Sequence, residues 1–184
     1  MSAPRWIYRF RNYFVSLPLI FASVFNYYEV EANGLIWPIA VVSVLAGIAL
    51  RIWAEQQLHY RTRGRKQLTT TGPYRFVRNP LYIGNMIMCV GATIASELLW
   101  LIPITIFWCI GIYSTVIRYE EGHLVERYGD EYRGYLLEVP RWLPKGLSFK
   151  NLDLTNENLY RVASIELTGI FILLPFVIKE ILNI

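Results

Sequence analysis

Long apolar runs separated by shorter polar segments dominate the pattern of this chain of 184 residues. A helix needs roughly 20 mainly apolar residues to cross the hydrocarbon core of a bilayer. Five runs meet or approach that length, so the pattern predicts an all-α, polytopic membrane bundle of about five transmembrane helices. The first run is short and contains Pro18, which makes it either a tilted span or a re-entrant segment. The predicted spans are residues 13–28, 35–53, 81–98, 100–117 and 160–182.

The third and fourth spans are joined by almost no chain, the short stretch 97–100, and must form a tight antiparallel hairpin. At the start of the third span, Asn79 is a favourable N-cap and Pro80 suits the first helical position. We therefore predict a helix that begins at Pro80. The hairpin brings the start of this helix next to the end of the fourth span.

Charge fixes the predicted orientation. The chain is 54% hydrophobic and carries a formal net charge of +4. Its basic residues gather before the first span and in the two long polar segments, between the second and third spans and between the fourth and fifth. Because basic loops stay in the cytoplasm, we predict an integral, multi-pass protein with its N-terminus and active site cytoplasmic. The positive charge then reflects orientation and attraction to anionic lipid headgroups, and we predict no nucleic-acid partner.

The metal-binding residue types are scattered. Cys89 and Cys109 lie inside predicted spans, which is typical of small core hydrophobes. His59 and His123 are far apart and belong to no ligand motif. We predict neither a metal nor a disulfide.

Candidate chemistry lies at the two cytoplasmic ends of the hairpin. The segment 78–82 combines an arginine, a tyrosine and a helix start. Opposite it lie Arg118, Glu120 and Glu121. A helix N-terminus attracts a carboxylate and glutamates hold an ammonium group, so this arrangement suits a zwitterionic small molecule. The simpler interpretation is a capped helix start facing a solvated helix end whose arginine reaches the membrane surface.

A second short helix is predicted after the fourth span. Gly129 followed by Asp130 indicates that one helix ends and another is capped. Tyr132 and Tyr135 share a face of this second helix and lie either on the membrane or over a ligand. The prolines and Trp142 that follow indicate an extended strap at the headgroup level.

An ordered set of motifs lies in the middle of the chain. It begins with the string Thr-Gly-Pro-Tyr-Arg-Phe-Val-Arg-Asn-Pro-Leu-Tyr-Ile-Gly at 71–84. The hairpin follows, and after it come Glu-Glu, Tyr-Gly, Glu-Tyr and Val-Pro-Arg, ending at Pro144. In these residues the chain resembles the isoprenylcysteine carboxyl methyltransferase and phospholipid methyltransferase superfamily. The resemblance covers 68–144, and we expect residues 1–184 to form one methyltransferase domain around this core. It implies a membrane enzyme that binds S-adenosylmethionine in a cytoplasm-facing pocket and methylates a lipophilic acceptor.

The resemblance also implies site residues. A carboxylate acceptor would require a positioning cation, for which Arg118 is the first candidate and Arg78 the second. Glu121 is the other catalytic candidate. The implied cofactor-binding residues are Leu68, Thr69, Tyr74, Asn79, Pro80, Leu81, Tyr82 and Glu120.

Several functions remain open at this point. The leading hypothesis is methylation of an isoprenylcysteine-type carboxylate, and the nearest alternative is N-methylation of a phospholipid amine. An NADPH-dependent sterol-type reductase and a non-catalytic lipid-binding protein are the others. Membrane lipids and a lipophilic or prenylated substrate are the expected partners.

Glu166 is an acid inside the last apolar run. Acids within a membrane are costly and often functional. Its position near the cytoplasmic end favours a carboxylate that reaches the interface or pairs with Arg161. The alternative is a polar contact at the mouth of a substrate tunnel.

Overall fold

The computed structural model describes residues 5–25, 30, 33–64, 67–144 and 159–182, with the side chains of 5, 33 and 59–64 left out. All regular structure in these residues is helical, which confirms the all-α prediction for the described part of the chain. The elements are α1 (Arg5–Val24), α2 (Asn33–Gly64), the 3₁₀ helix η1 (Gly72–Arg75), α3 (Pro80–Ala95), α4 (Leu101–Tyr128), α5 (Asp130–Glu138), α6 (Leu159–Glu166), the 3₁₀ helix η2 (Leu167–Leu173) and α7 (Leu174–Leu182).

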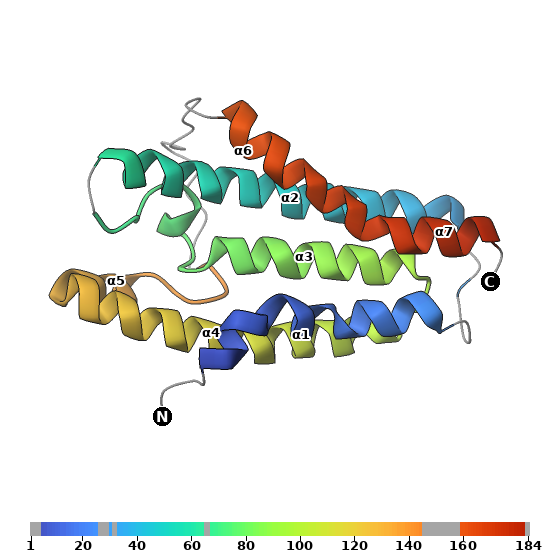
Figure 1. The fold of residues 1–184 in the computed structure, drawn as a ribbon, viewed down its shortest axis with the longest axis horizontal. Coiled ribbons are helices and arrows are strands. Elements are labelled where there is room, and N and C mark those ends of the chain that lie inside the picture. Colours follow the sequence, from blue (N-terminus) through green and yellow to red (C-terminus); the bar gives the residue numbers. More distant parts are fainter. Residues whose placement is uncertain (1–4, 26–29, 31–32, 65–66, 145–158, 183–184) are drawn as a thin grey trace.

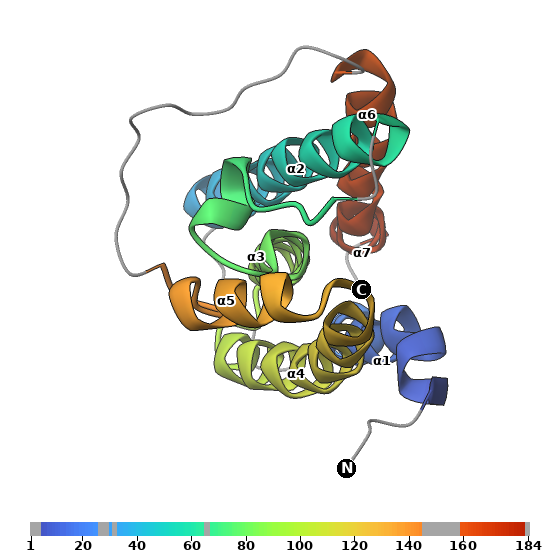
Figure 2. The same ribbon diagram turned by 90° about the vertical axis from the view of Figure 1, so that its left-hand side faces the viewer.

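The long helices run up and down along one axis, with α3 in the centre of the bundle (Figure 1). Viewed end on, α2 and α4 lie on opposite sides of α3, α1 lies beside α4, and α6, η2 and α7 lie beside α2 (Figure 2). The polar segments before α3 and after α4 come together at the same end of the bundle. This arrangement places η1, the start of α3, the end of α4 and α5 around one region.

Three segments are long and apolar enough to cross a membrane: Gly34–Leu58, Leu101–Tyr128 and Leu159–Leu182. Helix α3 is apolar but has only 16 residues. Helix α1 contains Pro18 and begins with an arginine-rich turn. The five crossings therefore stay a prediction, of which three have full-length candidates among the described residues.

The hairpin between α3 and α4 is confirmed. Helix α3 begins at Pro80 as predicted, and the turn after it is closed by bonds from the Glu97 N–H to the Ile94 carbonyl (2.9 Å) and from the Leu101 N–H to the Leu98 carbonyl (2.9 Å). The predicted capping bond is wrong, because the Asn79 side chain makes no hydrogen bond to the helix start. Asn79 lines both of the cavities described below.

Two helices extend beyond their apolar windows. Helix α2 continues to Gly64 and α4 continues to Tyr128, so each apolar helix is prolonged by polar turns. Both extensions lie at the end of the bundle that carries η1 and α5, which we call the motif end. Gly129 ends α4 with φ of 56°, a left-handed conformation that suits glycine. Asp130 is the first residue of α5 and not its cap, which corrects the predicted capping role.

Helices α2 and α3 approach very closely where glycines face each other. A Cβ added at Gly84 would lie 2.9 Å from the Gly47 carbonyl oxygen and 2.7 Å from Cγ of Arg51. The missing side chains let the backbones meet, as small residues do in membrane helix pairs. Cys89 and Cys109 are free thiols buried in the main core, as predicted for small core hydrophobes.

Candidate active site

Two adjoining cavities occupy the motif end of the bundle. The larger, of about 1020 Å³, is lined by residues of α1, α2, α3, α4, α6 and η2. The smaller, of about 340 Å³, lies among the segment 67–69, η1, α4 and α5. Six residues line both cavities and form their shared wall: Leu58, Tyr74, Arg78, Asn79, Glu120 and Leu124.

Glu120 joins the two ends of the hairpin. The buried Tyr82 hydroxyl donates a hydrogen bond of 2.8 Å to Glu120 Oε1. The Tyr82 ring in turn packs against the Tyr113 ring, with centroids 4.7 Å apart. A carboxylate has about four lone-pair sites, so this single bond orients Glu120 and leaves it able to accept from a ligand.

Two donors beside Glu120 lack a protein partner. Asn79 Nδ2 and Arg78 Nε are buried and have no hydrogen-bond partner among the described residues. An unsatisfied buried donor costs about 1–3 kcal/mol, and more when it is charged. Because Arg78 and Asn79 line both cavities, a ligand with an anionic oxygen would relieve this cost.

Glu121 lies between two arginines, in a cluster that we name the Glu121 clamp (Glu121, Arg78 and Arg141). Arg141 Nη2 is 2.5 Å from Glu121 Oε2, and Arg78 Nη1 is 3.3 Å from Glu121 Oε1. The Arg78 N–H also donates to the Pro140 carbonyl at 2.9 Å. The clamp therefore fastens the segment after α5 to the start of α3 and the end of α4.

Three buried tyrosines line the smaller cavity. The Tyr135 hydroxyl donates to the Tyr74 carbonyl at 2.7 Å, which ties α5 to η1. Burial raises the pKa of Tyr132 to about 12 and raises the pKa values of Tyr74 and Tyr135 well above the ordinary phenol value. All three phenols therefore stay protonated near neutral pH. Tyr132 and Tyr135 of α5 are buried and line this cavity, so they do not lie on the membrane surface, and a position over a ligand stays a prediction.

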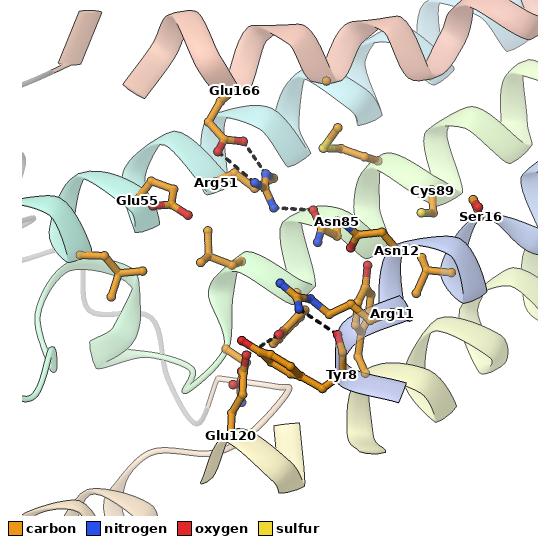
Figure 3. Close-up of a pocket in the computed structure, with 18 of the residues that line it drawn as sticks. Tyr8, Arg11, Asn12, Ser16, Arg51, Glu55, Asn85, Cys89, Glu120 and Glu166 are labelled. Atoms are coloured by element: carbon orange, nitrogen blue, oxygen red, sulfur yellow. Dashed lines mark hydrogen bonds and ion pairs between the residues drawn. The ribbon is translucent and has the colours of Figure 1, made fainter. Parts of the chain in front are cut away.

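A second polar group lies across the larger cavity (Figure 3). Arg51 donates from Nε and Nη2 to the two oxygens of Glu166, at 2.5 and 2.9 Å, and from Nη1 to Asn85 Oδ1 at 2.5 Å. Glu166 is 8% exposed, so the pair is largely removed from water. The predicted pairing with Arg161 or with the interface is thus wrong. Glu166 lines the larger cavity, in the position of the alternative that the sequence allowed.

Comparison with known proteins places this architecture. Residues 37–131, just over half of the chain, match the model of the phospholipid methyltransferase family. The chain belongs to the phospholipid methyltransferase family. The match includes the helix with Arg51, the motif segment and the α3–α4 hairpin, and it confirms the superfamily resemblance seen in the sequence.

The curated relatives of this family member differ in function. The chain is 30% identical over 113 residues to the nickel-cobalt-cadmium resistance protein NccN of Alcaligenes xylosoxydans xylosoxydans, covering 61% of this chain and 52% of that protein. It is 36% identical over 73 residues to methanethiol S-methyltransferase 1 of Bradyrhizobium diazoefficiens, covering 39% and 24%. It is 34% identical over 82 residues to the protein-S-isoprenylcysteine O-methyltransferase of Schizosaccharomyces pombe, covering 42% and 33%.

The chain spans about half the length of the resistance protein and less of the two methyltransferases. No solved structure matches it. Within the described residues, no group of three or more His, Cys, Asp or Glu side chains is arranged to hold a metal ion. The comparisons therefore fix the family and leave the acceptor open.

Most of the site residues implied by the sequence line the cavities of this methyltransferase-family protein. Asn79, Tyr74 and Glu120 line both cavities. Pro80 is buried and lines neither. Arg118 is exposed on α4 and lines neither, so the structure does not bring it to the others. Leu81 and Tyr82 line the larger cavity, and Leu68, Thr69 and Glu121 line the smaller one.

The sequence interpretation missed polar cavity residues contributed by α1, α2 and α3. Arg11 on α1 lines the larger cavity, donates to the Tyr8 carbonyl at 3.0 Å and lies 4.6 Å from the centre of the Tyr8 ring. Arg51 was visible as a cation ending an apolar run, and Asn85 lies one turn after Tyr82 on the same helix face. Nothing in the sequence pattern places Arg11 in a cavity with them.

Proposed function

We propose that this protein is an integral membrane methyltransferase that uses S-adenosylmethionine and methylates a lipophilic acceptor, with an isoprenylcysteine-type carboxylate as the first candidate. The observation that carries the proposal is the shared wall of the two cavities. There, buried donors without protein partners lie beside a carboxylate, in a chain of a methyltransferase family.

The residues of this wall fit the amino-acid part of S-adenosylmethionine. Asn79 Nδ2 and Arg78 Nε would donate to its carboxylate, and Glu120 would accept from its ammonium group. Tyr132 and Tyr135 give the smaller cavity the aromatic surface that an adenine ring requires. When bound, S-adenosylmethionine supplies an electrophilic methyl group on a sulfonium centre.

The chain's own contribution to catalysis is to position the reacting groups and to exclude water from them. Tyr82 holds Glu120 in one orientation through its 2.8 Å hydrogen bond. An acceptor in the larger cavity would lie against the same wall, where Tyr82 and Glu120 would help to hold it beside the cofactor. Holding reacting atoms about 3–3.5 Å apart in a water-poor pocket supplies much of the rate of a displacement reaction.

The larger cavity suits an acceptor with a long apolar part. Its lining includes Val15 and Leu19 of α1, Met88 of α3 and Ile172 of η2. We propose that the five predicted crossings place this cavity within reach of bilayer lipids, with the motif end in the cytoplasm. The basic residues at that end support this orientation.

N-methylation of a phospholipid amine is the second candidate, and the matching family model favours it by its description. The two candidates differ in the charge of the nucleophile. A carboxylate acceptor needs donors across the larger cavity, whereas an amine acceptor must be delivered there uncharged. Arg11 lines that cavity and favours the carboxylate, whereas Arg51 in the same lining is already paired with Glu166.

The test is methyl transfer by the purified protein in lipid nanodiscs. S-adenosylmethionine with a labelled methyl group is added with either S-farnesylcysteine or phosphatidylethanolamine. We expect label in a base-labile ester of the prenylated cysteine. Label on the amine would support the second candidate. Saturable NADPH binding without S-adenosylmethionine binding would overturn the proposal in favour of a reductase.

A further inference from the structure

Helix α1 presents one continuous face to the larger cavity. The lining residues of α1 recur at the three- and four-residue spacing that keeps side chains on one side of a helix. Along this face the polar side chains of Arg11 and Asn12 come before the aliphatic side chains of Val15 and Leu19. An amphiphilic acceptor has the same order of polar head and apolar chain. The six residues of the face are Tyr8, Arg11, Asn12, Val15, Ser16 and Leu19.

Arg11 is the arginine of the larger cavity that has no carboxylate partner in the described part of the chain. The other two, Arg51 and Arg78, each pair with a glutamate. Arg11 instead donates from Nη1 to the Tyr8 carbonyl at 3.0 Å and lies 4.6 Å from the centre of the Tyr8 ring. These contacts hold the guanidinium without cancelling its charge. Its remaining N–H donors form a planar fork that suits the two oxygens of a carboxylate.

An aromatic contact holds this part of α1 against the end of α4. The Tyr8 ring packs against the Tyr119 ring, with centroids 5.2 Å apart, and Tyr119 is next to Glu120 in the sequence. Figure 3 shows the Arg11 side chain reaching from α1 into the cavity whose lining also includes Glu120. An anion bound by Arg11 would therefore lie in the larger cavity, close to the wall that both cavities share.

Helix α1 is not part of the segment that matches the family model, which begins at residue 37. The six residues of the shared wall all lie within that segment. The cavity is thus built from two sources, a family core that supplies the shared wall and a preceding helix that supplies an unpaired cation and an apolar strip. A change in α1 can alter what the larger cavity accepts while leaving the shared wall intact.

We infer that α1 selects the acceptor: Arg11 binds the carboxylate of a lipophilic acid, and the apolar strip that ends at Leu19 receives its chain. This inference rests on the proposed function and names Arg11, in place of the exposed Arg118, as the cation for the acceptor. Arg11 and Leu19 are eight residues apart, which is about 12 Å along a helix. Recognition therefore requires both a negative charge and a chain long enough to reach Leu19.

The first experiment measures binding without turnover. N-acetyl-S-farnesylcysteine and its carboxamide differ by one charge, and tryptophan fluorescence follows the binding of each to the protein in nanodiscs. We expect the protein to prefer the acid, and Arg11→Gln to lose about tenfold or more of that preference, the usual range for a charge-assisted hydrogen bond. Arg11→Lys keeps the charge without the planar fork and should recover part of the preference.

The matched control is Arg9→Gln, which removes an exposed arginine of the same helix that lines neither cavity. Each ligand partitions into the lipid to the same extent for every variant, so a changed ratio of the two affinities reports on the altered side chain. Arg9→Gln should keep the preference for the acid. Equal losses in Arg9→Gln and Arg11→Gln, or an unchanged preference in Arg11→Gln, would overturn the inference.

The second experiment tests the apolar strip. Leu19→Phe fills the part of the α1 face that is farthest from Arg11. We expect this variant to bind the farnesyl acid at least about fivefold more weakly, the lower end of the cost of overpacking, and the shorter geranyl acid as before. Leu17→Phe is the control, because Leu17 is 45% exposed and does not line the cavity. Equal weakening of both acids would mean that Leu19 only packs α1, and the assignment of the chain would be wrong.

The proposed function and this inference fail in different ways. If the protein neither binds S-adenosylmethionine nor transfers its methyl group, the proposed function fails, while the fluorescence comparison still reports on Arg11. If methyl transfer occurs but Arg11→Gln discriminates acid from amide as the unaltered protein does, the inference about α1 fails alone.

Discussion

The cavity wall at Glu120 and the clamp at Glu121 are one peptide bond apart, yet they are built differently. Glu120 accepts a bond from Tyr82 and lines both cavities. Glu121 has an arginine near each of its oxygens and holds the segment that follows α5. Consecutive residues on a helix point about 100° apart, so α4 presents the two carboxylates to different neighbours.

The difference shows how to separate a ligand site from a structural site of the same chemistry. A carboxylate that the protein has already paired with two cations has little left for a ligand. A carboxylate oriented by one neutral donor, beside buried donors without partners, retains its capacity. By this criterion we propose that Glu120 binds a ligand and that Glu121 supports the site, although the sequence made both of them candidates.

Removing the charge of Glu121 should have the largest effect on stability. Glu121 is 12% exposed and Arg78 14%, so Glu121→Gln leaves one largely buried cation, and Arg141 beside it, without a counter-charge. We expect a loss of about 3 kcal/mol, the lower end for breaking a buried ion pair. Thermal unfolding in detergent would record it as a lower Tm.

The matched control is Arg133→Gln. Arg133 and Asp130 form an ion pair of 3.1 Å whose side chains are 67% and 96% exposed. An exposed pair of this kind contributes roughly 0.2–1 kcal/mol, so the Tm should barely change. Equal shifts in the two variants would show that the Glu121 clamp does not stabilise the fold.

Glu120→Gln should give the opposite result. The amide oxygen can still accept from Tyr82, so the fold should persist, but the charge that would hold an ammonium group is lost. We expect S-adenosylmethionine to bind about 10 to 100 times more weakly, from the usual contribution of a charged hydrogen bond. Isothermal calorimetry measures this directly.

Glu126→Gln is the control for this change, because Glu126 is exposed on the same helix and lines neither cavity. It should leave cofactor affinity as it is. If Glu120→Gln lowered the Tm like Glu121→Gln and left cofactor affinity intact, the distinction between the two glutamates would be wrong. A non-catalytic lipid-binding role would then gain support.

The sequence predicted the features that depend on local patterns. The length of the apolar runs predicts the helices, Pro80 marks the start of α3, and the short link before Trp100 forces the hairpin that brings Tyr82 to Glu120. The motif segment also indicated the shared wall of the two cavities, because Tyr74, Arg78 and Asn79 of that wall are close in sequence. Each of these inferences needs only neighbouring residues or one tight turn.

The remaining features depend on packing between distant helices. Glu166 pairs with Arg51, 115 residues away, because α6 packs against α2. Arg118 lies on the exposed side of α4 and not on the side that lines the cavity, because its position around the helix axis differs from that of Glu120. Asn79 makes no capping bond to α3, and its side chain lines both cavities with Nδ2 lacking a partner among the described residues. The hydrophobic pattern alone does not predict any of these three features.

The smallest predicted effect on stability comes from the hydrogen bond between the Tyr135 hydroxyl and the Tyr74 carbonyl. Tyr135→Phe removes the donor to the Tyr74 carbonyl, a buried bond of 2.7 Å, and keeps the packing of the ring. We expect a loss of about 1 kcal/mol, the usual net value of one hydrogen bond. Tyr160→Phe removes a hydroxyl from a residue that is 91% exposed and should leave the Tm unchanged.

Combining Tyr135→Phe with Glu121→Gln tests whether α5 and the segment after it are fastened as one unit. Glu121 holds that segment through Arg141, and Tyr135 holds α5 to η1. If the two contacts support one unit, the double variant should lose less stability than the sum of the single losses, because the first loss already loosens what the second contact fastens. Additive losses, with cofactor affinity unaffected, would mean that the two contacts act separately and that α5 does not depend on the Glu121 clamp.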